Sequence, residues 1–219
     1  MNNLVLSIFP GIDLFGSAFE ETGYTVVRGP DLLWSGDVRT FHPPADVWGG
    51  IIGGPPCKGE SNLAALNGTR GATMVDEFWR IVQEAAPTWW VMEAVIRHDA
   101  PYVMALSPRW LGEKQSRRRY FHSNLDLERF IDVTLFEDPE WKHAVLAVHG
   151  GREGEVRRGM ATYSWKERCE LQGVPADFLA DAPFTRRGKN EVLGNGVPMA
   201  MGRAVAKAVR KAAGPQDRR

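Results

Sequence analysis

The sequence predicts an α/β fold in which helices cover both faces of a mostly parallel sheet. Short apolar runs at residues 4–9, 47–52 and 89–92 have the length and composition of buried strands. Segments with helical spacing of apolar side chains lie between them, at 13–22 and 74–86. Glycine or proline closes several of these segments. Strands that alternate with helices in this way are typical of a parallel sheet.

The first half of the chain gives the clearest boundaries. The run Leu4–Phe9 is predicted as a strand that ends at the turn Pro10–Gly11. A helix over Asp13–Thr22 then ends at Gly23, a residue suited to the left-handed position after a helix. Further strands are expected at 24–27, 47–52, 89–92 and 120–122, and a second helix at 74–86.

The second half is less regular. The runs 130–136 and 143–148 are predicted as strands, and 150–159 as a loop rich in glycine and arginine. Ser164, three residues before Glu167, forms a capping box that opens a helix toward Leu171. Pro198 suits the first turn of a last helix over 199–213.

Composition excludes several classes of protein. The chain has 219 residues and two cysteines, too few for a disulfide framework and without metal-binding spacing. No apolar run approaches the roughly 20 residues that span a bilayer, and no basic segment precedes the first apolar stretch as in a signal peptide. We therefore expect a cytoplasmic protein that does not bind membranes. The net charge of +0 argues against a polyanion as partner, although basic residues cluster at 109–119, 152–158 and 186–189.

The segment Gly53-Gly54-Pro55-Pro56-Cys57 carries the strongest chemical signal. It places a thiol on a rigid turn after a predicted strand, at the edge where open α/β sheets bind ligands. Cys57 is therefore a candidate nucleophile. The alternative is that Cys57 is a small buried hydrophobic residue.

Two further segments carry charges at predicted strand ends. Glu93 ends an apolar strand that should run parallel to the one before Cys57; partial desolvation would raise its pKa and make it a proton donor. If a strand begins at Arg119, then Arg117 and Arg119 share one face, where two guanidinium groups suit phosphate or base-oxygen recognition. A solvent-facing glutamate and a solvated basic loop are the alternatives.

Taken in order, these segments resemble the DNA cytosine-C5 methyltransferase family. The resemblance covers nearly the whole chain and includes the nucleophile loop GGPPCKGES, Glu93-Ala94-Val95 in place of Glu-Asn-Val, and a Gln-x-Arg-x-Arg pattern ending at Arg119. It also includes the following segments: Phe9 to Phe15, Asp31, Gly36-Asp37-Val38, Glu167 to Phe178, and Gly194-Asn195-Gly196-Val197-Pro198.

The resemblance implies a Rossmann-like, S-adenosylmethionine-dependent methyltransferase fold with a small irregular insert. Residues 1–121 would form the catalytic core, 122–161 a reduced target-recognition segment, and 162–219 the motifs that return to the core. It further implies S-adenosylmethionine as cofactor without a metal, and double-stranded DNA with a flipped cytosine as substrate. A monomer in a bacterial or phage-infected cell is expected, as in restriction-modification or phage DNA methylation.

The same resemblance assigns roles to individual residues. Cys57 would add to C6 of cytosine, Glu93 would hold and protonate N3, Arg119 would bind O2, and Arg117 would support the loop or a phosphate. The residues expected to bind the cofactor are Phe9, Gly11, Ile12, Asp31, Asp37, Pro55, Asn195 and Val197. Those expected to contact DNA are Lys58, Ser61, Gln115, Arg152, Arg157 and Arg158.

Departures from the family pattern keep other functions open. Asp13 replaces a glycine and is expected to put a carboxylate near the cofactor, and Lys58 replaces a glutamine. Because charge near the sulfonium could alter the choice of cofactor, both residues keep open the alternative of RNA cytosine as substrate, or of a transferred group other than methyl. Ala94 in place of asparagine favours a catalytically inactive DNA-binding homologue. Apart from Phe9, expected near adenine, we predict that the aromatic residues and Cys169 pack in the core; these aromatic residues are Trp34, Trp48, Trp89 and Trp90.

Overall fold

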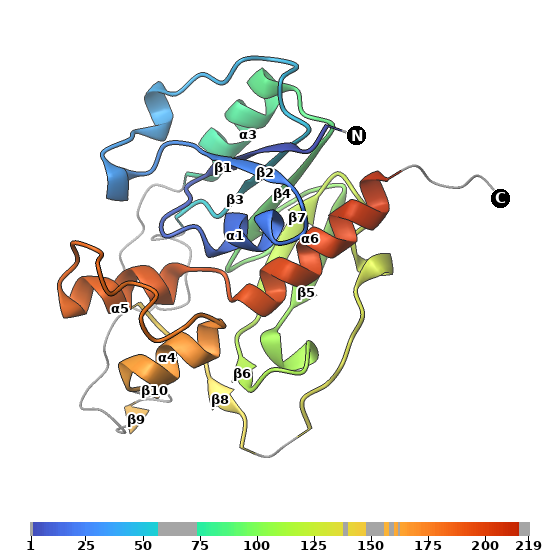
Figure 1. Cartoon of the computed structure of the whole chain (residues 1–219). Coiled ribbons are helices and arrows are strands. Elements are labelled where there is room, and N and C mark those ends of the chain that lie inside the picture. The colour runs from blue at the N-terminus through green and yellow to red at the C-terminus, as the bar shows by residue number, and fades with distance from the viewer. Residues whose placement is uncertain are drawn as a thin grey trace.

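Six strands form the central sheet of the part of the chain that the computed structural model describes, in the order β2-β1-β3-β4-β7-β5 (Figure 1). The described residues are 2–56, 74–137, 140–147, 156–157, 160–161 and 163–214, with the backbone alone at 156–157 and 160–161. The sheet strands are β1 (Leu4–Ile8), β2 (Thr25–Arg28), β3 (Gly50–Gly53), β4 (Trp89–Ala94), β5 (Tyr102–Leu106) and β7 (Arg119–Ser123).

The sheet is mostly parallel, as the sequence predicts. β1 pairs in parallel with β2 and β3, and β3 pairs in parallel with β4. β7 inserts between β4 and β5 and runs antiparallel to both. The carboxyl ends of β1, β3 and β4 therefore meet at one edge of the sheet, together with the start of β7.

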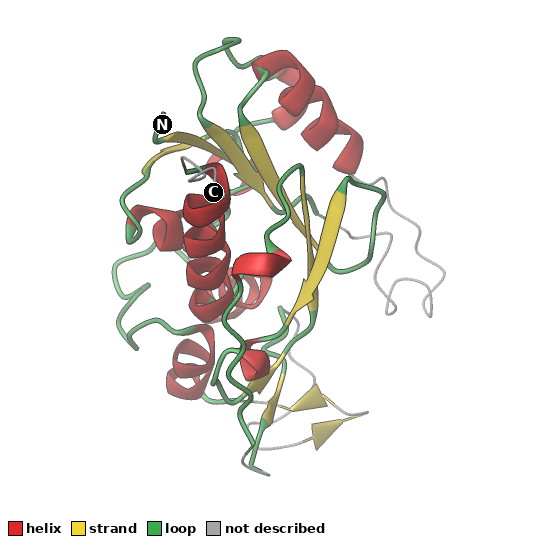
Figure 2. Ribbon diagram, turned by 90° about the vertical axis from the view of Figure 1, so that its right-hand side faces the viewer, coloured by secondary structure: helices red, strands yellow, loops and turns green. Residues whose placement is uncertain are grey.

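Helices cover both faces of the sheet (Figure 2). Alternate residues of β4 show the two faces: Trp89 and Val91 join one buried cluster, while Trp90 and Met92 join the other. Helices α1 and α6 contribute to the first cluster and α3 to the second. The helices are α1 (Leu14–Glu20), α3 (Val75–Ala85), α4 (Trp165–Gln172), α5 (Arg186–Asn195) and α6 (Met199–Ala213).

Short elements complete the fold. Two small strand pairs lie beside the main sheet, and four 3-10 turns join longer elements. The strands are β6 (Gln115–Ser116), β8 (Lys142–His143), β9 (Val156–Arg157) and β10 (Met160–Ala161); the turns are η1 (Leu32–Trp34), η2 (Val38–Thr40), η3 (Pro108–Trp110) and η4 (Glu128–Phe130).

Helix starts follow the predicted capping chemistry. The side chain of Ser164 accepts a hydrogen bond from the backbone N–H of Glu167, whose carboxylate accepts one from the Ser164 backbone, so the predicted capping box of α4 is confirmed. Pro198 lies directly before α6 and ends the extended chain that leads into it. Cys169 on α4 has no exposed surface, as predicted.

The predicted strand at 130–136 is wrong. Its first residue ends η4, and the rest is an irregular segment with one isolated bridge, from Thr134 to Leu111. Val133 and Leu135 are 69% and 52% exposed, so the apolar spacing there does not correspond to burial. Of the predicted strand at 143–148, only His143 lies in a strand, as the second residue of β8, and 148 is outside the described residues.

Besides the short strands and turns, two longer elements were missing from the sequence prediction. β5 is a short apolar run that completes the edge of the sheet beyond β7. α5 contains two glycines and little apolar periodicity, and it begins where the Thr185 side chain accepts a hydrogen bond from the Gly188 N–H. Arg157, expected in a loop, lies on β9, paired with β10.

The packing around Trp89 gives a stability prediction. A Cβ atom at Gly50 would stand 2.2 Å from the buried Trp89 indole, which stacks on Phe19 at 5.7 Å. We expect Gly50→Ala to lower the free energy of unfolding by about 1–3 kcal/mol, because neither ring can move without disturbing the core. Gly188→Ala is the matched control, since its Cβ would meet only ordinary contacts at 3.4 Å and more. Urea unfolding of both variants tests this; equal stability of the two would contradict the packing described.

Candidate active site

Glu93 and Arg119 form a buried ion pair at the carboxyl edge of the sheet. Glu93 is the fifth residue of β4, and Arg119 is the first residue of the antiparallel strand β7. The Arg119 Nε atom lies 2.9 Å from Oε1 of Glu93, and their side chains are 16% and 13% exposed. The two groups that the sequence predicts at strand ends are therefore in direct contact.

Burial controls the acidity of Glu93. Loss of water raises the pKa of Glu93 above its usual value, and the positive charges of Arg119 and Arg117 oppose this without cancelling it. A carboxyl group with a raised pKa holds its proton more readily near neutral pH. Glu93 can therefore act as a proton donor to a group that replaces water beside it.

The segment after β3 begins directly over Glu93. Gly53 ends β3 opposite Met92 of β4 in the parallel register. A Cβ atom placed on Gly54 would lie 3.1 Å from Oε2 of Glu93, so a side chain at this position would press on the Glu93 carboxylate. Pro55 is buried. Cys57, Lys58 and Ser61 lie outside the described residues.

The loop after β1 makes a tight turn next to the end of β2. Phe9 and Gly11 both have left-handed backbone angles, with φ of 55° and 57°. The Asp31 carboxylate accepts hydrogen bonds from the N–H groups of Gly11 and Leu33, each at 2.8 Å. Apart from its chain neighbours, no atom of the described residues lies within 4 Å of a Cβ placed on Gly11, so the space beside this turn is open in the described part of the chain. Asp31 thus stands at the rim of an open site.

Asp13 turns away from this open space. Its side chain is 3% exposed and accepts hydrogen bonds from the Ser7 hydroxyl at 2.8 Å and the Gly16 N–H at 3.0 Å, while Arg28 lies 3.0 Å from its second oxygen. Burial raises the pKa of Asp13 above its usual value. The carboxylate caps the start of α1 and does not reach toward the open space beside Gly11.

Asp37 begins the turn η2. Its side chain accepts a hydrogen bond from the Arg39 N–H at 3.0 Å and pairs with the Arg39 guanidinium at 2.7 Å. These hydrogen bonds hold the pKa of the Asp37 carboxyl below its usual range. Asp37 is therefore an ionised acceptor.

Arg117 lies inside the protein rather than on its surface. Its terminal nitrogens donate to the carbonyl oxygens of Val145 at 2.5 Å and Gly194 at 2.9 Å, which joins segments far apart in the sequence. Burial, followed by the charge of Arg119, lowers the pKa of Arg117 to about 9, against the opposing effect of Glu93.

Gln115 belongs to the same buried network. Its side chain has no exposed surface, donates to the carbonyl oxygen of Leu171 at 2.5 Å and accepts from the Val145 N–H at 3.1 Å. Gln172 continues the network by donating to the carbonyl oxygens of Leu193 and Gly196. The structure thus places Gln115 within the protein, where its hydrogen-bonding groups are already used.

The segment around Asn195 packs against the start of α1. A Cβ atom on Gly196 would stand 2.9 Å from Leu14, and Val197 is buried in the cluster that α1 and α6 share. Asn195 is exposed, and Ile12 packs partly buried beside Leu14. The segment around Asn195 therefore lies beside the start of α1, directly after the turn that follows β1. Among the residues expected to contact DNA, Arg152 and Arg158 lie outside the described residues.

Trp34 is a site residue that the sequence reasoning assigned wrongly. Trp48, Trp89 and Trp90 are buried as predicted, but Trp34 is 54% exposed. Its indole N–H donates to the carbonyl oxygen of Gly11 at 2.7 Å, and its ring lies 5.8 Å from that of Phe184. In the sequence, only its position three residues after Asp31, a residue expected to bind the cofactor, indicated that Trp34 lies near the turn at Gly11.

Other features of the described residues lie away from this edge. A surface hollow of about 470 Å³ contains none of the predicted site residues; it is lined by Trp79, Trp90, Asp99, Ala100 and Pro101. Within the described part of the chain, no three His, Cys, Asp or Glu side chains come together as a metal site would require. No helix there is long and apolar enough to cross a membrane.

Comparison with known proteins identifies the fold. No protein-family model and no curated protein matches the chain. Among solved structures, the chain is similar to the Entamoeba histolytica methyltransferase EhMeth, with a TM-score of 0.63, 10% identity and coverage of 96% of this chain and 98% of that one. A putative DNA modification methyltransferase encoded within a prophage of E. coli gives a TM-score of 0.65, 16% identity and coverage of 96% and 99%. S. pombe Dnmt2 methyltransferase gives a TM-score of 0.61 and 13% identity, with coverage of 98% of this chain and 99% of that one. The chain therefore shares the fold of these methyltransferases.

The raised pKa of Glu93 predicts a pH-dependent stability. Because the folded state binds the Glu93 proton more tightly than the unfolded state, this proton stabilises the fold below the unfolded pKa of about 4.3 and the contribution is lost as pH rises through the folded pKa. Glu93→Gln carries no such proton. We expect wild type to lose stability relative to Glu93→Gln as pH increases from about 4 to 8. Urea unfolding across this range measures the difference; a constant difference would show that the pKa of Glu93 is not raised.

Proposed function

We propose that this protein transfers a methyl group from S-adenosylmethionine to C5 of cytosine in DNA, through a covalent adduct between Cys57 and C6 of a flipped base. The buried pair of Glu93 and Arg119 carries this proposal. Glu93 as a proton donor and Arg119 as a hydrogen-bond donor lie side by side, which supports binding of the adjacent N3 and O2 atoms of a pyrimidine. The passage of Gly54 over the Glu93 carboxylate supports it further.

The chain length after Gly54 suits this role for Cys57. Cα atoms three residues apart are separated by at most about 11 Å in an extended chain. Gly54 itself lies over Oε2 of Glu93. A base held by Glu93 is therefore within the range in which the Cys57 sulfur can approach its C6 atom.

The reaction follows from the electronic structure of cytosine. As the Cys57 thiolate forms a bond to C6, the π electrons of the C5–C6 bond shift through the ring toward N3, where Glu93 supplies a proton. Arg119 donates hydrogen bonds to O2 and stabilises the same developing negative charge. C5 becomes nucleophilic and would take the methyl group as the bond from methyl to the sulfonium sulfur breaks, with S-adenosylhomocysteine as the leaving group. Water then removes the C5 proton, the thiolate leaves C6 and the C5–C6 double bond is restored. N3 returns its proton to Glu93, so both Cys57 and Glu93 are regenerated.

The residues around Gly11 fit S-adenosylmethionine better than a dinucleotide. Dinucleotide sites use the N–H groups at a helix start to bind pyrophosphate, but Asp13 already fills that place on α1 with a carboxylate. Asp31 and Asp37 are acceptors suited to ribose hydroxyls and an adenine amino group. Phe9, Ile12, Asn195 and Val197 would surround the cofactor, with Pro55 on the side of the nucleophile loop. When bound, S-adenosylmethionine supplies an electrophilic methyl group.

Arg117 and Gln115 would act by holding the site together. Arg117 fixes the backbone at Val145 and Gly194. This supports a role in holding segments of the protein together, rather than in binding a phosphate. We keep Lys58, Ser61, Arg152, Arg157 and Arg158 as proposed DNA contacts. The proposal includes double-stranded DNA as substrate, a monomer, and a core at 1–121 with a recognition segment at 122–161 and returning motifs at 162–219.

RNA cytosine, a different transferred group and an inactive homologue are the competing functions. A different transferred group was considered because Asp13 was expected to put a carboxylate near the cofactor. The Asp13 side chain is buried, which weakens that argument. The ion pair of Glu93 with Arg119 argues against an inactive protein, because burying two charges without function is costly. The substrate itself is decided by experiment.

Activity is tested by mass spectrometry of nucleosides after incubation with S-adenosylmethionine and either duplex DNA or RNA. We expect 5-methyldeoxycytidine from DNA. Cys57→Ser should abolish it, because the hydroxyl does not add to C6, and Glu93→Gln should lower the rate by about 10²–10⁴-fold. Cys169→Ala is the matched control, because it removes a thiol buried in α4. Modified nucleosides from RNA alone, or a fully active Cys57→Ser, would overturn the proposal.

A further inference from the structure

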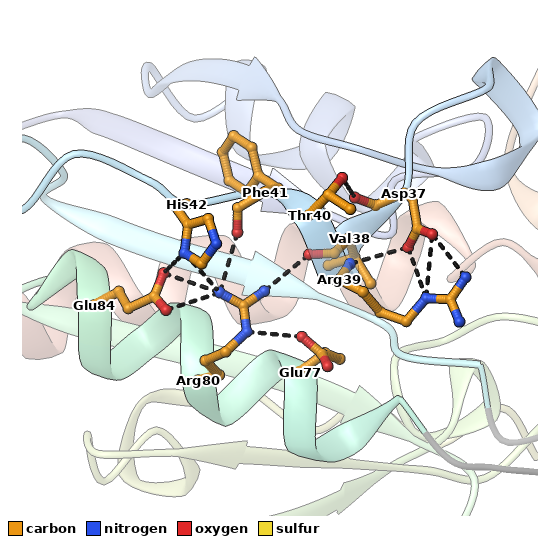
Figure 3. A network of polar contacts seen from close by, with 9 residues as sticks. All are labelled: Asp37, Val38, Arg39, Thr40, Phe41, His42, Glu77, Arg80 and Glu84. Atoms are coloured by element: carbon orange, nitrogen blue, oxygen red, sulfur yellow. Dashed lines mark hydrogen bonds and ion pairs between the residues drawn. The ribbon is translucent and has the colours of Figure 1, made fainter.

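Arg80 of α3 donates hydrogen bonds to both ends of the turn that follows Asp37 (Figure 3). One terminal nitrogen donates to the carbonyl oxygen of Val38 at 2.8 Å, and the other donates to that of Phe41 at 3.1 Å. Val38 is the first residue of η2, and Phe41 directly follows it. A single guanidinium group thus spans the whole turn.

Two carboxylates of α3 fix the orientation of this guanidinium. Nε of Arg80 donates to Glu77 at 2.8 Å, one turn before it, and a terminal nitrogen pairs with Glu84 at 2.9 Å, one turn after it. His42 lies 3.0 Å from Glu84 and extends the network to the chain beyond Phe41. The Arg80 side chain is 27% exposed, so most of the arginine is packed in place. The planar group is therefore oriented before any ligand arrives.

The turn needs such support. η2 has three residues, and its backbone hydrogen bonds run from Thr40 to Asp37 and from Phe41 to Val38, each at 3.2 Å. A 3-10 turn this short is weakly stable alone. The buried Val38 side chain and Arg80 are its connections to α3.

Asp37 retains capacity for a ligand. Arg39 occupies part of its carboxylate and favours the ionised form. Three N–H groups of Arg39 make four contacts with this carboxylate, because Nε is shared between its two oxygens. A carboxylate offers about four acceptor positions, so about one is left for a ligand among the described residues. Because Asp37 directly precedes Val38, its direction depends on where η2 is held.

We propose that Arg80 is a positioning residue that aims Asp37 at the exocyclic amino group of the adenine of the cofactor, and so sets selectivity for adenosine. This inference rests on the proposed function, since it needs an adenosine-containing cofactor beside Asp37. Arg80 acts through the carbonyl oxygens of Val38 and Phe41 and does not touch the cofactor. Its substitution should therefore affect recognition of one chemical group rather than binding as a whole.

The experiment is a thermodynamic cycle in the full-length protein. Calorimetry measures binding of S-adenosylhomocysteine and of an analogue in which purine replaces adenine, so that the amino group is missing. Arg80→Met should weaken S-adenosylhomocysteine about tenfold, as for the loss of one hydrogen bond to a charged acceptor, and change the purine analogue by less than about twofold. Arg203→Met is the matched control: Arg203 pairs with Glu21 between α6 and α1, away from η2.

Each outcome separates this inference from the proposed function. Failure of wild type to bind S-adenosylhomocysteine would overturn the proposed function. Tight wild-type binding with an equal loss for both ligands in Arg80→Met, or with no loss, would overturn the role of Arg80 and leave the function intact. If Arg80→Met does not fold, Arg80→Lys replaces it. One ammonium group cannot span both carbonyl oxygens, so the same selective loss of affinity for S-adenosylhomocysteine is expected. An equal change in affinity for both ligands, or no change in either, would contradict the role of Arg80.

Discussion

The ion pair between Glu93 and Arg119 is the interaction on which this site depends. Its 2.9 Å contact joins strands β4 and β7, which run antiparallel, so the last part of one and the first residue of the other meet at the carboxyl edge of the sheet. Burial at this edge has two opposite effects. It strengthens the attraction between the charges, and it favours the protonated form of Glu93. The pair is thus a stable structural contact that can still give up a proton to a base placed against it.

Around this pair, buried polar side chains connect the C-terminal third of the chain to the sheet. Arg117 and Gln115 bind the backbone at Val145 from the sheet side, while Gln172 binds the backbone at Leu193 and Gly196. Buried donors and acceptors of this kind are costly unless each is satisfied, so they specify one arrangement of the connected segments. Gly196 in turn packs against Leu14, so the segment around Asn195 lies next to the start of α1. Two parts of the chain far apart in sequence are therefore held together there.

Much of the first half could be predicted because local chemistry decides it. Residues 48–52 and 89–92 are buried on both faces of the sheet, and the cap at Asp13 determines the start of α1 from a few neighbouring residues, as the cap at Ser164 does for α4 in the second half. The second half was harder. Val133 and Leu135 have the composition of a strand but no partner strand to bury them, and α5 carries two glycines in a helix held mainly by tertiary contacts. At the site, the sequence pattern placed Glu93 and Arg119 at strand ends, and only the family resemblance brought them to one base. Neither could show that Gln115 faces inward or that Trp34 is exposed, because both depend on segments distant in sequence.

The central claim is that a sulfur atom at position 57 attacks a base held by Glu93. Duplex DNA containing 5-fluorocytosine tests it most directly, because fluorine at C5 cannot leave as a proton does and the adduct stays covalent. Incubation with S-adenosylmethionine should give a protein–DNA complex that survives denaturing electrophoresis, and digestion followed by mass spectrometry should place the modified base on Cys57. An adduct on Cys169, or methylated DNA without any covalent complex, would contradict the account.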